Sequence, residues 1–194
     1  MPNLKHSVLK KFVLIGASTG GPGQIEKIVN ALNPLSSTTV VIAQHMVEGF
    51  IPSFMNRLKI KSNNPISMAQ NNTRIEVGNI YICSGHTQIT QNMAQLYFLQ
   101  EVSPANTYNP DINLLFNSFS NFVHEIQTLG VILTGIGDDG VNGCKALSEN
   151  GAKCITEDEH AIVDGMPSRA RFLVANIEAS GIDTIIQSIK EFCE

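Results

Sequence analysis

Three side chains of the kinds used by hydrolases each follow a short apolar run of this sequence. Ser18 lies in the segment GASTGG, residues 16–21, at the end of the run KFVLIGA. His45 comes just after the run TVVIA, and Asp139 lies in the segment GIGDDG after the run VILT. A hydroxyl, an imidazole and a carboxylate can serve as nucleophile, general base and the group that orients the base. We therefore take Ser18, His45 and Asp139 as a candidate catalytic triad.

The surroundings of Ser18 fit this chemistry. Residues 16–20 match G-x-S-x-G, which lifts a serine hydroxyl onto a tight turn between a strand and a helix. The N-terminus of that helix offers unpaired N–H groups where an oxyanion would form. By itself, such a match often marks only a tight turn. The assignment of Ser18 as a nucleophile therefore depends on the presence of His45 and Asp139 at neighbouring strand ends.

Apolar, β-branched runs alternate with segments of helical period along most of the chain. Strands are predicted over residues 11–17, 39–43, 131–134 and 152–156, and helices over 22–32, 50–58 and 182–192. Asp111 is a good N-cap for a further helix, whose apolar stripe reaches Ile126, and another helix ends near Gly151. The alternation predicts a three-layer, doubly wound α/β fold around a mostly parallel sheet. The ends of its strands would bring the three reactive side chains to one edge.

The middle of the chain is different. Short strand-like runs separated by turn-prone residues predict antiparallel hairpins at one edge of the sheet, over residues 66–69, 80–83, 87–90 and 95–99. No repeat, low-complexity segment or long linker interrupts the pattern. We therefore expect one domain over residues 1–194.

Composition excludes several classes of function. A hydrophobic share of 43% and a net charge of −4 describe a globular chain with no general attraction to nucleic acid or anionic lipid. No apolar run approaches the roughly 20 residues that span a bilayer, and the polar start of the chain is unlike a signal peptide. We expect a cytoplasmic protein with four free cysteines, no metal site and no cofactor. Nothing in the sequence indicates an oligomeric state.

Several separated motifs occur together and in order. The segments IGASTGGP, VVIAQHM, GNIYICSG, YNPDINLLF, VILTGIGDDG and DGMPSRA cover nearly the whole chain. With them the chain resembles the catalytic domain of the CheB chemotaxis methylesterases. The resemblance implies that Ser18, His45 and Asp139 are the triad and that the backbone N–H groups of Thr19 and Ile136 stabilise the oxyanion. It also places Met166 and Pro167, as the family's MP pair, in a loop near the site.

The resemblance implies hydrolysis of glutamate γ-methyl esters on the cytoplasmic signalling helices of methyl-accepting chemotaxis receptors, and the same machinery can deamidate glutamine. Family members usually carry a receiver domain. Here only about ten residues precede the first strand, too few for a domain, so we expect a methylesterase domain without a receiver. The sequence departs from the family at Ile136, often Met, at Asp138, often Asn, and at Ser84, where the family has proline. Asp138 could raise the basicity of His45 or face solvent.

One alternative belongs to a different class. The glycine-rich turn over residues 16–23 could cradle a phosphate at a helix N-terminus, as in a nucleotide-binding module. Against this, the turn has neither GK[ST] nor G-x-G-x-x-G, and Gln44-His45 replaces the acidic residue that would bind a ribose. Two charged clusters are expected to be solvated surface, the basic Arg57, Lys59 and Lys61 and the acidic Glu157, Asp158 and Glu159.

Overall fold

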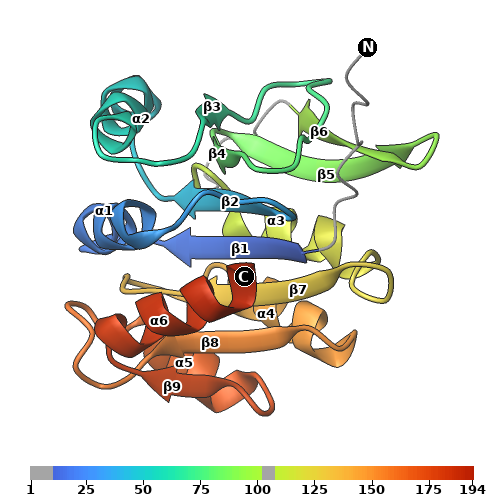
Figure 1. Ribbon diagram of the computed structural model, residues 1–194. Helices are drawn as coiled ribbons and strands as arrows, with labels where there is room; N and C mark the ends of the chain where they lie inside the picture. The colour runs from blue at the N-terminus through green and yellow to red at the C-terminus, as the bar shows by residue number, and fades with distance from the viewer. Residues whose placement is uncertain (1–10, 102–107) are drawn as a thin grey trace.

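The computed structural model describes residues 11–101 and 108–194, and its centre is a seven-stranded parallel sheet (Figure 1). The strand order is β3-β4-β2-β1-β7-β8-β9. The strands are β1 (Lys11–Ala17), β2 (Thr38–Gln44), β3 (Ile66–Met68), β4 (Ile80–Ile82), β7 (Gln127–Ile132), β8 (Lys153–Glu157) and β9 (Glu178–Ser180). The predicted doubly wound, mostly parallel α/β fold is confirmed.

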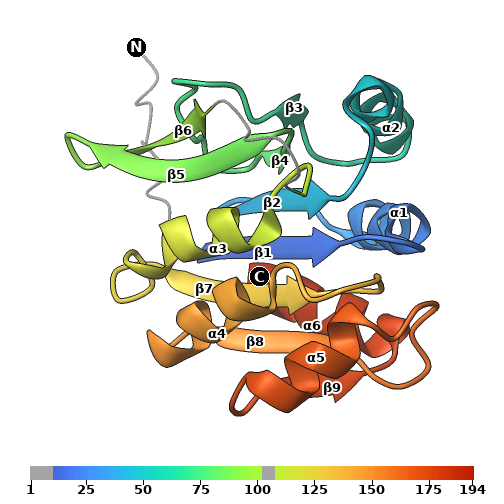
Figure 2. The ribbon, with the colours of Figure 1, turned by 180° about the vertical axis from the view of Figure 1, so that it is seen from behind.

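Helices cover both faces of this sheet. One face carries α1 (Gly21–Ala31), α2 (Ile51–Lys59) and α6 (Ile182–Cys193), with the short helix η1 (Glu48–Phe50) leading into α2. The other face carries α3 (Ile112–Ser120), α4 (Val141–Glu149) and α5 (Met166–Leu173), as Figure 2 shows. Strand β1 contributes side chains to the cores on both faces of the sheet, because its alternate side chains point to opposite faces. Val13 and Ile15 pack under one layer, and Phe12 and Leu14 under the other.

A separate antiparallel hairpin lies beside β3 and β4, on the face of the sheet that carries α3 (Figure 2). It consists of β5 (His86–Asn92) and β6 (Gln95–Glu101). Its two turn residues, Met93 and Ala94, both have positive φ, which matches the right-handed twist of paired strands. The hairpin packs on α3, where the backbone N–H of Ile89 donates to Ser118 Oγ.

Some predicted elements differ from the observed ones. β3 and β4 pair in parallel and extend the main sheet, so the prediction that they form an antiparallel hairpin is wrong. Every residue of β4 is buried, as in an interior parallel strand, and so short an apolar run does not reveal its pairing direction. Helix α3 ends at Ser120 instead of Ile126, and neither α5 nor β9 was predicted.

Candidate active site

The candidate residues meet where the order of the sheet reverses. β1 lies between β2 and β7, with Ala17 opposite Gln44 and Gly16 opposite Ile132. The helices that follow β1 and precede β7 lie on opposite faces, so a crevice opens beyond the carboxyl ends of these strands. Ser18, His45 and Asp139 come from the three segments that follow β1, β2 and β7.

The turn that carries Ser18 is held by its backbone. Ser18 N donates to the carbonyl of Thr134 at 2.9 Å, and Ser18 O accepts from Gly21 N at 2.9 Å and from Gln44 Nε2 at 2.8 Å. Gly20, with φ of 84°, forms the N-cap of α1 in the left-handed region that favours glycine. The side-chain hydroxyl of Ser18 makes no hydrogen bond to any described residue. It is therefore available for chemistry.

Close packing explains two other glycines of this turn, Gly16 and Gly21. A Cβ atom at Gly21 would collide with Gln44 Oε1, and one at Gly16 would lie 2.5 Å from Ile112 Cγ2. Glycine at these positions thus lets helices and side chains approach the backbone. Gly16 and Gly21 therefore need no bound phosphate to account for them, whereas a Cβ atom at Gly23 would meet nothing within 4 Å.

His45 and Asp139 are joined directly. His45 Nε2 lies 2.7 Å from Asp139 Oδ2, and the His45 backbone N–H donates to Ala17 O at 2.9 Å, which fixes the residue beside the end of β1. Among the residues described, no hydrogen bond links the ring to Ser18. Because Nε2 is engaged with the carboxylate, Nδ1 is the ring nitrogen left to act as a base.

Asp139 is 1% exposed, and backbone groups of α3 solvate its carboxylate. Ile112 N donates to Oδ2 and Asn113 N donates to Oδ1, both at 2.9 Å. These are the first N–H groups of α3, where the helix dipole favours negative charge. Asp111 caps the same helix by accepting from Leu114 N at 2.7 Å, as predicted. Asp139 can therefore bind His45 while buried.

Two backbone N–H groups stand free on either side of Ser18. Neither Thr19 N nor Ile136 N donates a hydrogen bond within residues 11–101 and 108–194. The peptide that carries Thr19 N is fixed through its carbonyl, Ser18 O, which accepts from Gly21 N and Gln44 Nε2. Both N–H groups stay available as the predicted oxyanion donors. The exposed side chain of Asp138 adds a second carboxylate to the loop without a partner among the described residues.

Met166 and Pro167 do not lie in a loop, and that expectation is wrong. They form the first turn of α5, where proline is well tolerated, and both are buried. Met166 N donates to Gly135 O at 2.8 Å, and a Cβ at Gly135 would meet both the Met166 sulfur and Ser18 Cβ. Met166 therefore supports the loop after β7 from inside.

Two further residues of the candidate site, Tyr108 and Gln44, follow no sequence pattern that predicts a role there. The Tyr108 ring stacks on His45 with centroids 4.8 Å apart and planes 4° from parallel. Gln44 Nε2 bonds the carbonyls of both Ser18 and His45. Tyr108 lies in YNPDINLLF and Gln44 in VVIAQHM, two of the segments that carry the family resemblance. This position is the one sequence feature that points to a role in the candidate site.

Glu157 was considered only as surface, yet it is 2% exposed at the end of β8. It accepts hydrogen bonds from Thr134 N and from Gln24 Nε2. Burial raises the pKa of the Glu157 carboxyl, although these two hydrogen bonds act in the opposite direction. The prediction of a solvated turn is therefore wrong for Glu157.

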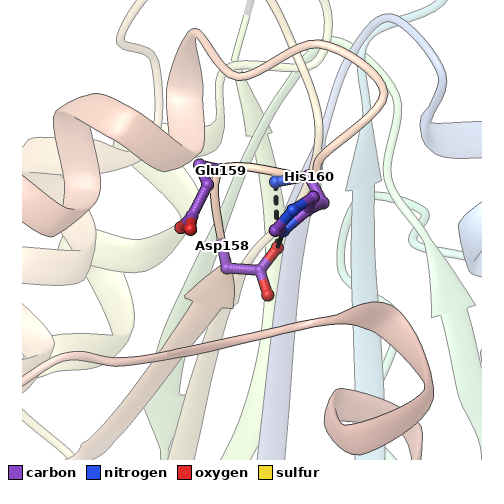
Figure 3. Close-up of side chains that lie close together, drawn as sticks. All are labelled: Asp158, Glu159 and His160. Atoms are coloured by element: carbon purple, nitrogen blue, oxygen red, sulfur yellow. Dashed lines mark hydrogen bonds and ion pairs between the residues drawn. The ribbon is translucent and has the colours of Figure 1, made fainter.

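The turn that follows Glu157 carries possible cation ligands. Asp158, Glu159 and His160 place one ligand atom each within 4.8 Å of one another (Figure 3). His160 Nδ1 lies 3.3 Å from Asp158 Oδ1, which also accepts from His160 N. These bonds are those of an exposed turn, and we assign the group no part in the reaction.

The cysteines lack the properties of nucleophiles. All four cysteines are buried. All four are also free thiols, which confirms the prediction. Burial raises the pKa of Cys83 to about 12 and that of Cys193 to about 11, so neither is a thiolate at neutral pH. In the part of the chain that the structure describes, no helix is long and apolar enough to cross a membrane.

Comparisons with known proteins identify the family and the fold. The family model described as CheB methylesterase matches residues 13–189. The solved structure of the Thermotoga maritima CheB methylesterase catalytic domain is similar with a TM-score of 0.85 and 26% sequence identity. The match covers 94% of this chain and 98% of that one.

Two relatives are named protein-glutamate methylesterase/protein-glutamine glutaminase. The Geobacter metallireducens protein is 36% identical over 182 residues, which are 92% of this chain and 52% of that protein. The Photorhabdus laumondii protein is 34% identical over 185 residues, which are 93% of this chain and 51% of that protein. This chain spans about half the length of these curated relatives. By its sequence and its fold, the chain belongs to the CheB methylesterase family.

Proposed function

We propose that this chain hydrolyses glutamate γ-methyl esters on methyl-accepting chemotaxis receptors, with Ser18 as nucleophile, His45 as general base and Asp139 as the residue that orients His45. The observation that carries the proposal is the 2.7 Å contact between His45 Nε2 and the buried Asp139, at the sheet edge that also carries Ser18. A buried aspartate on one ring nitrogen fixes the tautomer whose other nitrogen accepts a proton.

The reaction follows from these roles. His45 Nδ1 takes the proton of Ser18 Oγ as that oxygen attacks the ester carbonyl, and the oxyanion forms against the N–H groups of Thr19 and Ile136. His45 returns the proton to the methoxide oxygen, so methanol leaves. Water, activated by His45, then cleaves the acyl-enzyme and leaves a free glutamate.

The same steps would deamidate a glutamine, with ammonia leaving in place of methanol. The double names of the Geobacter and Photorhabdus proteins support this second activity. No step requires a cofactor. The proposed substrate segments are the cytoplasmic signalling helices of the receptors, which places the enzyme in the cytoplasm.

Release of methanol from radiomethylated receptor membranes tests the proposal. We expect Ser18→Ala to lower the rate about a millionfold while the protein stays folded, because a triad that loses its serine retains only weak catalysis. Ser36→Ala, an exposed serine before β2, is the matched control and should behave as the wild type. Equal release by Ser18→Ala and wild type would overturn the assignment of Ser18.

A further inference from the structure

Tyr108 covers one face of the candidate general base. Its ring lies parallel to the His45 imidazole, with centroids 4.8 Å apart and planes 4° from parallel. At 47% exposure, Tyr108 contributes little to the core, so burial alone does not explain why an aromatic ring stands there. Its described aromatic contact is His45.

Backbone hydrogen bonds hold Tyr108 in this place. The next residue, Asn109, accepts from Met46 N at 3.1 Å, and Met46 follows His45 directly. The Asn109 side chain accepts from Gly85 N at 2.7 Å. The segment that carries Tyr108 is thus hydrogen-bonded to the segment that carries His45. This bond holds the two rings in their stacked position.

The phenol end of Tyr108 reaches the loop that carries Asp139. A Cβ atom at Gly137 would lie 3.2 Å from Tyr108 Oη, and Gly137 has a φ of 88°. Tyr108 therefore lies across His45 and against the loop after β7. A ring in this position limits how far the imidazole can rotate away from Asp139.

The charge on the imidazole changes during the proposed reaction. As Ser18 Oγ bonds to the ester carbon, its proton moves to Nδ1 and the ring becomes an imidazolium. The proton then leaves with the methoxide oxygen, and the ring is neutral again. An aromatic face within about 6 Å attracts a cation through its quadrupole and attracts a neutral ring far less. Tyr108 would thus stabilise the charged ring of the transition state more than the resting one.

We propose that Tyr108 is a positioning residue for this reaction, which holds the plane of His45 and stabilises its imidazolium form through the π-face. This inference rests on the proposed role of His45 as general base. Tyr108 itself exchanges no proton or electron.

Two variants separate the ring from the hydroxyl. Tyr108→Phe keeps the π-face and should keep kcat within about twofold of the wild type. Tyr108→Leu keeps an apolar cover without a π-face and should lower kcat about twofold to fivefold, the range expected for a half-exposed cation–π contact, with little change in KM. Phe172→Leu is the control, since Phe172 is 84% exposed on α5 and should leave kcat unchanged.

The pH profile adds a readout that a purely structural role would not move. Without the π-face the imidazolium is less stable, so the acidic limb of kcat/KM in Tyr108→Leu should move to lower pH by a few tenths of a unit. Among the charged residues, Asp139 is bonded to Nε2, Asp138 is its neighbour in the same loop, and Glu48 lies three residues after His45 in the sequence. All of them are unchanged in both variants.

A measurement without substrate separates this inference from the proposed function. In NMR spectra the ring current of Tyr108 should shift the His45 ring protons upfield in the wild type and in Tyr108→Phe, and the shift should vanish in Tyr108→Leu. A ring-current shift without esterase activity in any variant would sink the proposed function and this inference with it. An active enzyme whose kcat and pH profile are the same in Tyr108→Leu would overturn the inference alone. So would equal losses in both variants, which would assign the effect to the hydroxyl, or a change confined to KM.

Discussion

At the level of single residues, the carboxylate of Asp139 contacts the candidate general base and the start of α3 with the same two oxygen atoms. Oδ2 faces His45 Nε2 and also accepts from Ile112 N, while Oδ1 accepts from Asn113 N. All three donors approach a side chain that is almost fully buried. A change at this residue therefore affects both catalysis and the start of α3.

Asp139→Asn should expose this double role. An amide can present only one oxygen, so its NH₂ group would face either Asn113 N or the shared site of Ile112 N and His45 Nε2. We expect kcat to fall about 10⁴-fold, as when a triad aspartate becomes asparagine, and the free energy of unfolding to fall by about 1–3 kcal/mol. Ester hydrolysis and urea denaturation measure the two effects.

The neighbouring residue gives the control for that experiment. Asp138→Asn makes the same chemical change on an exposed side chain and should leave both rate and stability near those of the wild type. If Asp138→Asn were the inactive variant and Asp139→Asn the active one, the candidate triad would be wrong.

The sequence predicts the three candidate triad residues because each follows a recognisable strand. Tyr108 and Gln44 escape such reasoning. Tyr108 does not directly follow a predicted strand, and its proposed role depends on its stacking contact with His45. Gln44 is the last residue of a buried strand, and only the fold reveals that its amide bonds the carbonyls of Ser18 and His45.

At the level of secondary-structure elements, a buried polar network ties the end of β8 to the turn after β1. Glu157 accepts from Thr134 N and from Gln24 Nε2 on α1. Thr134 in turn accepts from Ser18 N and donates its hydroxyl to Thr19 O. The network has one defect, because the buried Gln24 Oε1 has no hydrogen-bond partner among the described residues.

Glu157→Gln should remove the buried charge while the network keeps its hydrogen bonds to Gln24 and Thr134. After the Gln24 amide rotates, the new NH₂ group can donate to Gln24 Oε1 while the new oxygen accepts from Thr134 N. Burial raises the folded-state pKa of Glu157 above its ordinary value of 4.5. The wild type therefore loses stability as pH rises from about 4.5 through the raised pKa, because Glu157 then ionises in the folded protein. We expect the variant to be more stable at neutral pH by about 1 kcal/mol.

Thermal unfolding at a series of pH values checks this sign. The difference in Tm between Glu157→Gln and the wild type should be small at pH 4 and should grow as pH rises. Glu178→Gln, an exposed carboxylate on β9, provides the comparison and should show no such growth. A difference that shrinks with rising pH would contradict the raised pKa.

The elements near the centre of the sheet are those that the sequence predicts well. β1 and β2 have seven residues each and contain the buried apolar runs FVLI and VVIA, a pattern typical of interior parallel strands. β3, β4 and β9 have three residues each, and α5 has a weakly amphipathic sequence with Arg169 and Arg171. Tertiary contacts decide whether elements this short form, and the local sequence pattern does not reveal those contacts.

At the level of the whole molecule, exposed apolar side chains gather around the candidate active site. They stand in the segments after β2, before α3, after β7 and before α5, namely Val47, Phe50, Tyr108, Ile136 and Ile162. A cavity of about 470 Å³ lies beside them, lined by Pro22, Met46, Phe50, Ser53, Phe54 and Arg57. An apolar rim of this kind suits contact with another protein surface.

Phe50→Ser should therefore distinguish a protein substrate from a small one. Phe50 is 65% exposed on this rim, and its loss should lower kcat/KM for methylated receptors about tenfold, the effect of a modest interface hot spot. Hydrolysis of a small methyl ester should stay unchanged. Ile60→Ser changes a residue that is 78% exposed at the far end of α2, where it caps the helix, and should affect neither substrate.

The placement of Asp139 also bears on how this fold can change over generations. The Ser18 hydroxyl bonds to no described residue, so a lineage that no longer needs the reaction can replace it at no cost to folding. Asp139 anchors α3, and mutations there are removed by selection for a folded protein even after the reaction is lost. Among descendants that have become inactive, the aspartate should outlast the serine.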